Sequence, residues 1–244
     1  KNNAGTVDVL SVANGGAINC LASEVIVLSS VFSTNKALSS SKGIGGAIAS
    51  LYCSVTLKDD IFRTNEASHY AGAMDLTSHS ELKIYSTMFD GNVAPKDGGT
   101  IRINQPMTAE IEDTTFQNGR AGKGGCIHAS GVHFMTIKGS TFKNCIATDI
   151  GGGAGMYLAN DVVTVKVIGS KFLDNKATEG PGGGVHWVAA PHQMIACPLE
   201  VDAVTLANSH RNNAKYGDVL SSSAFYLTFQ NETAMSQFPS QISS

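Results

Sequence analysis

Short stretches of alternating apolar and polar residues recur along this chain, each one ending shortly before a phenylalanine. The positions seven and five residues before that phenylalanine are always apolar, whereas the residues beside them are mostly polar. Alternation with a period of two predicts a strand that buries one face. The apolar positions are Val25, Val27, Val55, Leu57, Leu82, Ile84, Ala109, Ile111, Met135, Ile137, Val165 and Val167.

The phenylalanines belong to a phrase, FxxN followed two residues later by alanine, whose copies are spaced 26 to 30 residues apart. A glycine-rich phrase recurs between them, and a second apolar strand follows it, with Ile18, Ile48, Met74, Ile101, Ile127, Met156, Val185 and Val219 at one inward position. A shared period of this length indicates a solenoid, a propeller or a repeat array. The phenylalanines are Phe32, Phe62, Phe89, Phe116, Phe142 and Phe172.

The residue pattern within one repeat unit indicates which kind of solenoid the chain forms. No unit has the apolar spacing of 3.6 residues that a helix requires, whereas about 27 residues with short strands and turns of Gly, Ser and Asn suit one coil of a β-helix. We therefore expect a right-handed single-stranded parallel β-helix of about seven to eight coils over residues 1–223. The repeats are clearest to residue 188, an insertion spans 188–200, and 224–244 form a terminal strand and polar tail.

Equivalent positions in successive coils of such a stack lie directly above one another. The phenylalanines are expected to form an internal ladder of stacked rings. Three residues after the phenylalanine, asparagine amides are expected to bond the turn backbone and the next asparagine along the stack. These asparagines are Asn35, Asn65, Asn92 and Asn175. Both sets are interpreted as structural.

Composition narrows the function. The net charge is −3 and the 17 Lys and Arg residues are scattered, so no nucleic-acid partner is expected. No apolar run is long enough for a membrane span, and no signal peptide precedes the repeats. The repeat phrase already begins at residues 2–4, which favours a piece of a longer or processed protein. The five cysteines have no metal-ligand spacing, so no metal or cofactor is expected, and buried thiols or one to two disulfides remain open.

One row of variable residues is the candidate partner-binding site. It follows the inward residue of the second strand and is predicted to project outward from one sheet, unless it is only a mixed solvated face. Its members are Asp75, Arg102, His128, Tyr157 and His186. Asn231 begins the single glycosylation sequon, which matters only in a eukaryotic secreted protein.

The chain also has to be weighed as an enzyme, because parallel β-helices include polysaccharide-cleaving enzymes. Such catalysis requires carboxylates that converge on one face. Asp59 and Asp60 form the only adjacent acidic pair near a repeat, at a position where other coils carry bend residues, and we interpret them as a turn pair. No nucleophile, zinc or phosphate-loop motif is present. The sequence therefore predicts no catalytic residues.

Together, the GGA phrase followed by Ile, Met or Val and the FxxNxA phrase resemble the repeat of the chlamydial polymorphic membrane proteins. The resemblance covers residues 2–188 clearly and continues weakly to about 223. It implies a right-handed β-helix in a surface-displayed passenger region, whose bacterial members act as adhesins. The C-terminal barrel that exports those proteins is not present in this chain.

Three functions follow as expectations. The first is a non-enzymatic structural protein, extracellular or on the cell surface, that joins a larger assembly or filament through the exposed strand edges at the ends of the helix. The second is an adhesin passenger fragment that binds a host receptor. The third, less favoured, is a polysaccharide-degrading enzyme.

Overall fold

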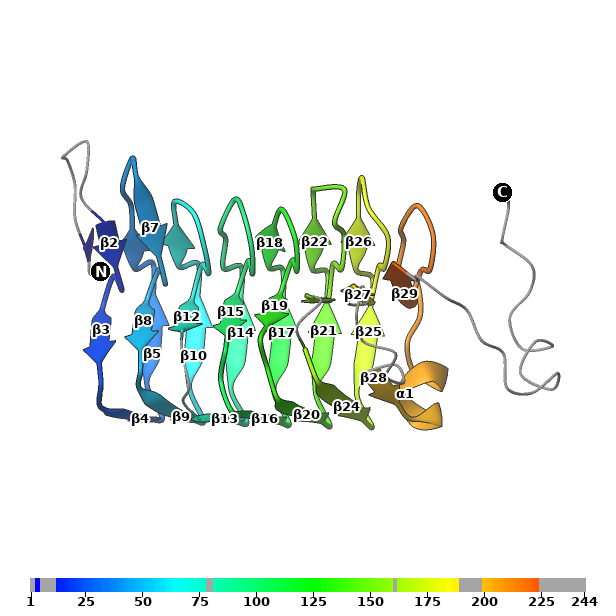
Figure 1. The fold of residues 1–244 in the computed structure, drawn as a ribbon, viewed down its shortest axis with the longest axis horizontal. Coiled ribbons are helices and arrows are strands. Elements are labelled where there is room, and N and C mark those ends of the chain that lie inside the picture. Colours follow the sequence, from blue (N-terminus) through cyan, green and yellow to red (C-terminus); the bar gives the residue numbers. More distant parts are fainter. Residues whose placement is uncertain (1–2, 5–11, 78–80, 160–161, 189–198, 224–244) are drawn as a thin grey trace, which may run out of the picture.

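The computed structural model describes residues 3–4, 12–77, 81–159, 162–188 and 199–223. Nearly all of the secondary structure in these residues is parallel β-sheet, stacked along one axis as a solenoid (Figure 1). This confirms the parallel β-helix predicted from the sequence. Six coils contribute a strand to each of three long sheets, and partial coils lie at both ends, so the count is slightly below the expected seven to eight.

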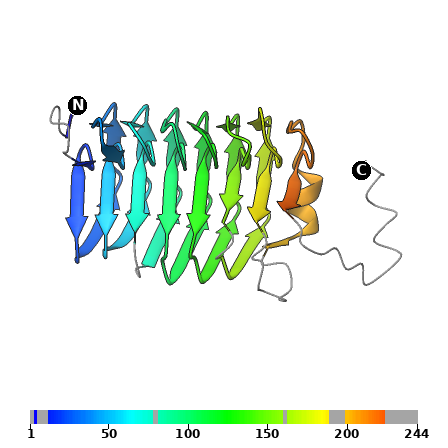
Figure 2. The ribbon, with the colours of Figure 1, turned by 45° about the horizontal axis from the view of Figure 1, so that its top comes forward.

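The first sheet follows the glycine phrases and contains eight strands, which Figure 2 shows as a row of parallel arrows. They are β3 (Ile18–Leu21), β8 (Ile48–Leu51), β12 (Met74–Thr77), β15 (Ile101–Asn104), β19 (Ile127–Ser130), β23 (Met156–Leu158), β27 (Val185–Val188) and β29 (Leu220–Ser223).

The second sheet contains seven strands with the alternating pattern, and the third sheet contains six that carry the phenylalanines. The second comprises β4 (Glu24–Leu28), β9 (Ser54–Lys58), β13 (Glu81–Tyr85), β16 (Thr108–Glu112), β20 (Phe134–Lys138), β24 (Thr164–Ile168) and β28 (Leu199–Val201). The third comprises β5 (Val31–Ser33), β10 (Ile61–Arg63), β14 (Met88–Asp90), β17 (Thr115–Gln117), β21 (Thr141–Lys143) and β25 (Lys171–Leu173).

Short strands line the corner between the third sheet and the next glycine phrase. Asn3 and Ala4 pair in register with Lys36 and Ala37, as the repeat phrase at residues 2–4 predicts. These strands are β1 (Asn3–Ala4), β2 (Val12–Asn14), β6 (Lys36–Ala37), β7 (Lys42–Ile44), β11 (Glu66–Ala67), β18 (Arg120–Ala121), β22 (Ile146–Ala147) and β26 (Lys176–Ala177).

The strand register agrees with the repeat alignment in all coils but the last. In the first sheet, Ile18 to Val185 occupy one inward row, as expected. In the last coil, however, Val185 pairs with Leu220, so the expectation that Val219 continues the row is wrong by one residue. The cause is the glycine phrase of this coil. Gly217, with a φ of 65°, lies three residues before Leu220, as Gly182, with a φ of 68°, lies three residues before Val185. Asp218 stands at the second glycine position, so an alignment that takes Gly217 for that second glycine ends one residue early.

The phenylalanines form the predicted ladder. Successive ring centroids from Phe32 to Phe172 lie 4.6 to 4.9 Å apart, with interplanar angles of 1° to 18°. Five rings are fully buried and only Phe32, at the N-terminal end, is half-buried. Stacked rings at strand spacing add to the burial of apolar surface, which makes this ladder the centre of the core.

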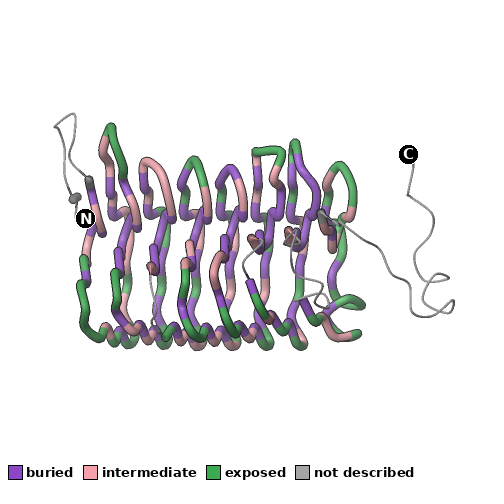
Figure 3. Tube along the Cα trace, viewed as in Figure 1, coloured by how far each residue is buried: buried purple, intermediate pink, exposed green. Residues whose placement is uncertain are grey.

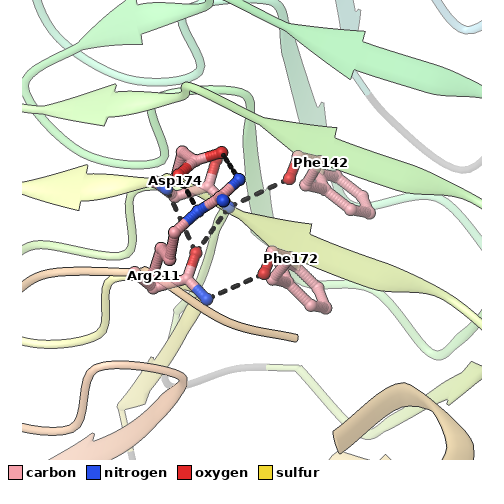
Figure 4. Close-up of polar contacts among 6 residues, drawn as sticks. Phe142, Phe172, Asp174 and Arg211 are labelled. Carbon is pink, nitrogen blue, oxygen red and sulfur yellow. Dashed lines mark hydrogen bonds and ion pairs between the residues drawn. The ribbon is translucent and has the colours of Figure 1, made fainter. Parts of the chain in front are cut away.

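The asparagine ladder is confirmed as well. Asn65 accepts the backbone N–H of Asn35 at 2.9 Å through Oδ1, and donates from Nδ2 to the carbonyl oxygen of Phe32 at 3.1 Å. Asn175 and Asn212 repeat this arrangement near the C-terminus. Figure 4 shows that end of the ladder, where amides bond the backbone oxygens of Phe142 and Phe172 beside the Asp174–Arg211 ion pair.

Two disulfides reinforce the coils. Cys20 bonds Cys53, which joins the first coil to the second, and Cys126 bonds Cys145, which joins the two ends of a single coil. Cys145 stands in the asparagine row, and the preceding coil has Gly119 there, where a Cβ atom would lie 2.7 Å from Cys126 Sγ. The disulfide thus explains both departures from asparagine. Cys197 lies outside the described residues.

The C-terminal coil ends differently from the others. A short helix, α1 (Ala203–Ala207), replaces the bend between the second and third sheets, and Asp202 caps it by accepting the N–H of Thr205. Ser209 occupies the phenylalanine position and accepts the N–H of Phe172 at 3.0 Å. The Phe ladder therefore stops at Phe172, and a polar coil covers it.

Candidate functional site

The variable row of the first sheet is continuous and in register. Asp75 pairs with Arg102, Arg102 with His128, His128 with Tyr157, and Tyr157 with His186 along consecutive strands. The alignment of the repeats thus brings together all five predicted residues, which are separated by 26 to 29 positions in sequence.

Asp75 and Arg102 form a bidentate ion pair in this row. The Arg102 guanidinium donates from both Nε and Nη2 to the two carboxylate oxygens of Asp75, with 3.1 Å between Nη2 and Oδ2. The ring of Tyr70, from the loop before the glycine phrase, lies 4.2 Å from the guanidinium carbon. A planar guanidinium suits both contacts, so the pair is held in one orientation.

Aromatic stacking continues the row toward the C-terminus. The rings of His128 and Tyr157 stack with centroids 5.1 Å apart, and Tyr157 meets His186 at 5.7 Å in a tilted arrangement. His186 Nδ1 lies 2.8 Å from the hydroxyl oxygen of Ser221, in the last strand. The Nζ atom of Lys123, a loop residue, lies 5.6 Å from the centroid of the Tyr157 ring. Side-chain contacts thus link β12 to β15 at one end of the row, and β19, β23, β27 and β29 to one another at the other end.

The row is not the solvated outward face considered from the sequence. Asp75 is 1% exposed, His186 2%, and His128 and Tyr157 are each 9% exposed. The side chains cover one another along the ladder, and Tyr70 and Lys123 from the loops cover them further. Parallel strands are commonly buried on both faces, and this sheet follows that rule. A partner approaching here would meet mainly the loops and the edges of the stacked rings.

Burial sets the protonation of His186. Removal from water lowers the pKa of His186 to about 4, while the contact with Ser221 opposes this shift. Burial also raises the pKa of Tyr157. At neutral pH the row therefore contains the neutral imidazole of His186 in tilted contact with the neutral phenol of Tyr157, which suits packing better than charge recognition.

This pKa shift predicts a loss of stability in acid. Above about pH 6.5 His186 is neutral in both folded and unfolded chains, so it contributes no pH dependence. Between about pH 6.5 and 4 the unfolded chain binds a proton that the folded chain refuses, which lowers the free energy of unfolding by roughly 3 kcal/mol at the acid end. Urea unfolding at a series of pH values measures this slope.

Two variants isolate the contribution of His186. His186→Gln is expected to remove the slope between pH 6.5 and 4, whereas the control His210→Gln, on an exposed side chain of the last coil, is expected to keep it. An unchanged slope in His186→Gln would contradict the assignment.

The Asp59–Asp60 pair performs two structural tasks. Asp59 lies in the bend with a φ of 58°, which supports its interpretation as a turn residue. Asp60 is 1% exposed and accepts the backbone N–H groups of Ser30 at 2.7 Å and Lys58 at 2.9 Å. Burial raises the pKa of the Asp60 carboxyl against the effect of these bonds.

Asp60 belongs to a third ladder that the sequence reasoning missed. Two residues before each phenylalanine the chain has a hydroxyl or this carboxylate, and from the second coil onward this group accepts a backbone N–H from the preceding coil. Each of these hydroxyls also donates to the backbone carbonyl oxygen two residues earlier in the same coil. In the last coil Thr205 of helix α1 accepts the N–H of Ser170 in its place. The signal was visible as a uniform row: Ser30, Asp60, Thr87, Thr114, Ser140 and Ser170.

Metal-ligating groups and long apolar helices were sought in the same structure. Among the residues that the structure describes, no group of three His, Cys, Asp or Glu side chains is close enough to hold a metal ion. In the same part of the chain, no helix has the length and apolar character needed to cross a membrane. Asn231 and the terminal strand and tail at 224–244 lie outside the described residues, as do positions 189–198 of the insertion.

The fold and its ladders define a parallel β-solenoid whose polar and aromatic side chains bind successive coils to each other. Comparison with protein-family models, with curated proteins and with solved structures gives no significant match. The resemblance to the chlamydial polymorphic membrane proteins therefore stays an expectation drawn from the two repeat phrases.

Proposed function

We propose that this protein is a non-enzymatic structural element, extracellular or at the cell surface, that takes part in a larger protein assembly. The observation that carries the proposal is that its buried acidic and histidine side chains bond to groups of neighbouring coils. The Asp75 carboxylate binds Arg102, the Asp60 carboxylate binds backbone N–H groups, and His186 contacts Ser221. Groups that an enzyme would direct at a substrate are occupied in joining coil to coil.

The two disulfides support the proposed extracellular location. Disulfides form and persist in oxidising surroundings, such as the cell exterior, and are rare where thiols are kept reduced. Cys20–Cys53 and Cys126–Cys145 are both buried in the coils. An extracellular location also suits a rod with few charged residues, 15% of the chain, and extensive backbone pairing between coils.

An adhesin passenger is the second candidate. The observation that favours it is the ring of Phe134, which is 59% exposed on the outer face of the second sheet. Thr108 and Thr164 flank it in register on the neighbouring strands. An exposed aromatic side chain between two threonines on the outer face of a sheet suits contact with a protein partner.

Labelling of intact source cells tests the proposal. A membrane-impermeant amine reagent is expected to label this chain, and non-reducing peptide mass spectrometry is expected to recover the Cys126–Cys145 linkage. A chain that labels only after lysis, or in which Cys20, Cys53, Cys126 and Cys145 are free thiols, would contradict the surface assignment. Hydrolysis of any member of a polysaccharide panel by the purified chain would contradict the non-enzymatic role. Binding to host cells that Phe134→Ser abolishes would instead support the adhesin.

A further inference from the structure

The segments that run from the third sheet into the following corner change in charge along the rod. They are residues 31–37, 61–67, 88–94, 115–121, 141–147 and 171–177. The first three segments together carry two basic and two acidic side chains, whereas the last three carry four basic and one acidic, in a chain whose net charge is −3. We call these four basic residues of coils four to six the basic face: Arg120, Lys143, Lys171 and Lys176.

Stacking of the coils brings the basic face together, although its members are far apart in sequence. Arg120 pairs in register with Ile146, and Ile146 with Lys176. The two charged residues therefore lie two strand spacings, about 10 Å, apart along the axis. Lys143 and Lys171 project outward beside the inward phenylalanines of β21 and β25. Figure 3 shows this alternation of buried and exposed residues repeating from coil to coil, and all four basic side chains are exposed.

Neighbouring carboxylates do not neutralise the basic face. Among the residues that the structure describes, none of its four side chains takes part in an ion pair. Asp174, the one acidic residue of these three segments, is paired with Arg211 of the next coil, as Figure 4 shows. The hydrogen bond from Arg211 lowers the pKa of Asp174, and the charges of Lys143 and His210 lower it further. This side of the rod therefore has an excess of positive charge.

A shallow groove of about 460 Å³ crosses the basic face at the corner. Arg120 and Lys176 line it together with the amides of Asn118 and Asn144. The amides form a chain, in which Asn144 donates to Asn118 at 3.3 Å and Asn118 donates to Asp90 at 2.7 Å. Each amide group has a second N–H that these two bonds do not use. The groove thus offers positive charges and neutral hydrogen-bond donors side by side.

This combination of groups suits an acidic polysaccharide. Sulfate and carboxylate groups accept charge-assisted hydrogen bonds from Arg and Lys. Sugar hydroxyls can bond to amides and to hydroxyls such as those of Thr115 and Thr141, which lie in register on the outward side of the third sheet. Because equivalent side chains recur at strand spacing, the face matches a linear polymer whose own groups repeat along its length.

Two other acidic partners fit this face less well. Single-stranded nucleic acid stacks its bases on aromatic side chains, and the outward positions of β17, β21 and β25 hold none. A protein partner is typically anchored by aromatic and Arg residues in well-packed pockets, whereas the outward residues of these strands are mainly Thr, Gln and Lys.

We propose that the basic face of coils four to six binds a linear acidic polysaccharide that lies along the axis of the rod. Arg120 and Lys176 bind acidic groups of the polysaccharide, and Asn118 and Asn144 bond its hydroxyls. This binding site goes beyond the structural function proposed above, because it requires neither assembly of the protein nor its absence.

Isothermal titration calorimetry with heparin, polygalacturonate and neutral dextran tests the proposal. The purified chain is expected to bind at least one of the two acidic polysaccharides at an ionic strength of about 0.15 M, and not to bind dextran. Arg120→Gln with Lys176→Gln is expected to weaken this binding by about tenfold or more, because it removes two charged contacts. The matched control, Lys58→Gln with Lys138→Gln, removes the same charge from exposed side chains of the second sheet and is expected to keep the affinity within about twofold.

The salt dependence of binding supplies a second measurement. Affinity is expected to fall as salt rises, and the fall is expected to be less steep in Arg120→Gln with Lys176→Gln, which makes fewer ionic contacts. Binding of heparin alone would support a sulfated partner, and binding of polygalacturonate alone would support a carboxylated one. No binding of either, equal binding of dextran, an equal loss in the two double variants, or tighter binding of polyglutamate or single-stranded DNA would overturn the proposal.

Discussion

Phe116→Ala is expected to lower the free energy of unfolding by about 3 to 5 kcal/mol, the cost of truncating a fully buried phenylalanine. The Phe116 ring is 0% exposed and stacks on Phe89 and Phe142, each 4.9 Å away between centroids. The neighbouring coils are expected to loosen with it, because each unit of a solenoid is stabilised by its nearest neighbours. Urea unfolding followed by circular dichroism measures the loss.

Phe32→Ala is the matched control for this prediction. Phe32 is half-buried and has only one stacking neighbour in the ladder, Phe62. Its truncation is therefore expected to cost clearly less than that of Phe116. Equal losses in the two variants would contradict this prediction, because Phe116 is both more deeply buried than Phe32 and stacked on two rings and not one.

Loss of the Cys126–Cys145 disulfide is expected to lower the free energy of unfolding by roughly 3 kcal/mol, because the cross-link restricts a loop of about 20 residues in the unfolded chain. The Cys126→Ala with Cys145→Ala variant makes this change without a reducing agent. Its urea unfolding curve, compared with that of the natural chain, gives the difference.

Cys126→Ala with Cys145→Asn separates the cross-link from the asparagine ladder. Ala47 and Ala73 occupy the position of Cys126 in earlier coils, and the amide introduced at position 145 would point at Phe116 O, the carbonyl oxygen that lies 3.9 Å from Cys145 Sγ. This variant is expected to recover about 1 kcal/mol relative to the double alanine variant. No recovery would argue that the ladder does not extend through this coil.

The repeat made the fold predictable. Because equivalent positions repeat every 26 to 30 residues, identifying Phe and Asn in one coil placed them in the others, and the ladders follow from strand spacing alone. The irregular C-terminal coil was less predictable. Helix α1 has no counterpart in the other described coils, and Asp218 stands where most other coils have the second glycine of their phrase, so Gly217 is easily mistaken for that glycine. The resulting slip of one residue separates Val219 from the inward position that Leu220 occupies.

The sequence predicted which strand positions form the candidate row, but it did not predict that this row is buried. Alternation shows which side of a strand Arg102 and His128 project from, and the register confirms it. Alternation does not show which loops cover that face of the sheet. Tyr70 belongs to a loop without strict periodicity, and its contact with Arg102 arises from the path of that loop. Burial of an outward row is decided by such loops, so the sequence pattern alone could not predict it.

The two disulfides also determine how far the rod extends under load. A pull on the chain on either side of the cross-links cannot straighten the 33 positions between Cys20 and Cys53 or the 19 between Cys126 and Cys145. At about 3.3 to 3.6 Å per extended residue, these stretches represent roughly 170 to 190 Å of chain that stays withheld. The coil closed by Cys126–Cys145 stays cross-linked even after the neighbouring coils have unfolded. The disulfides therefore limit how far the molecule can be extended by force.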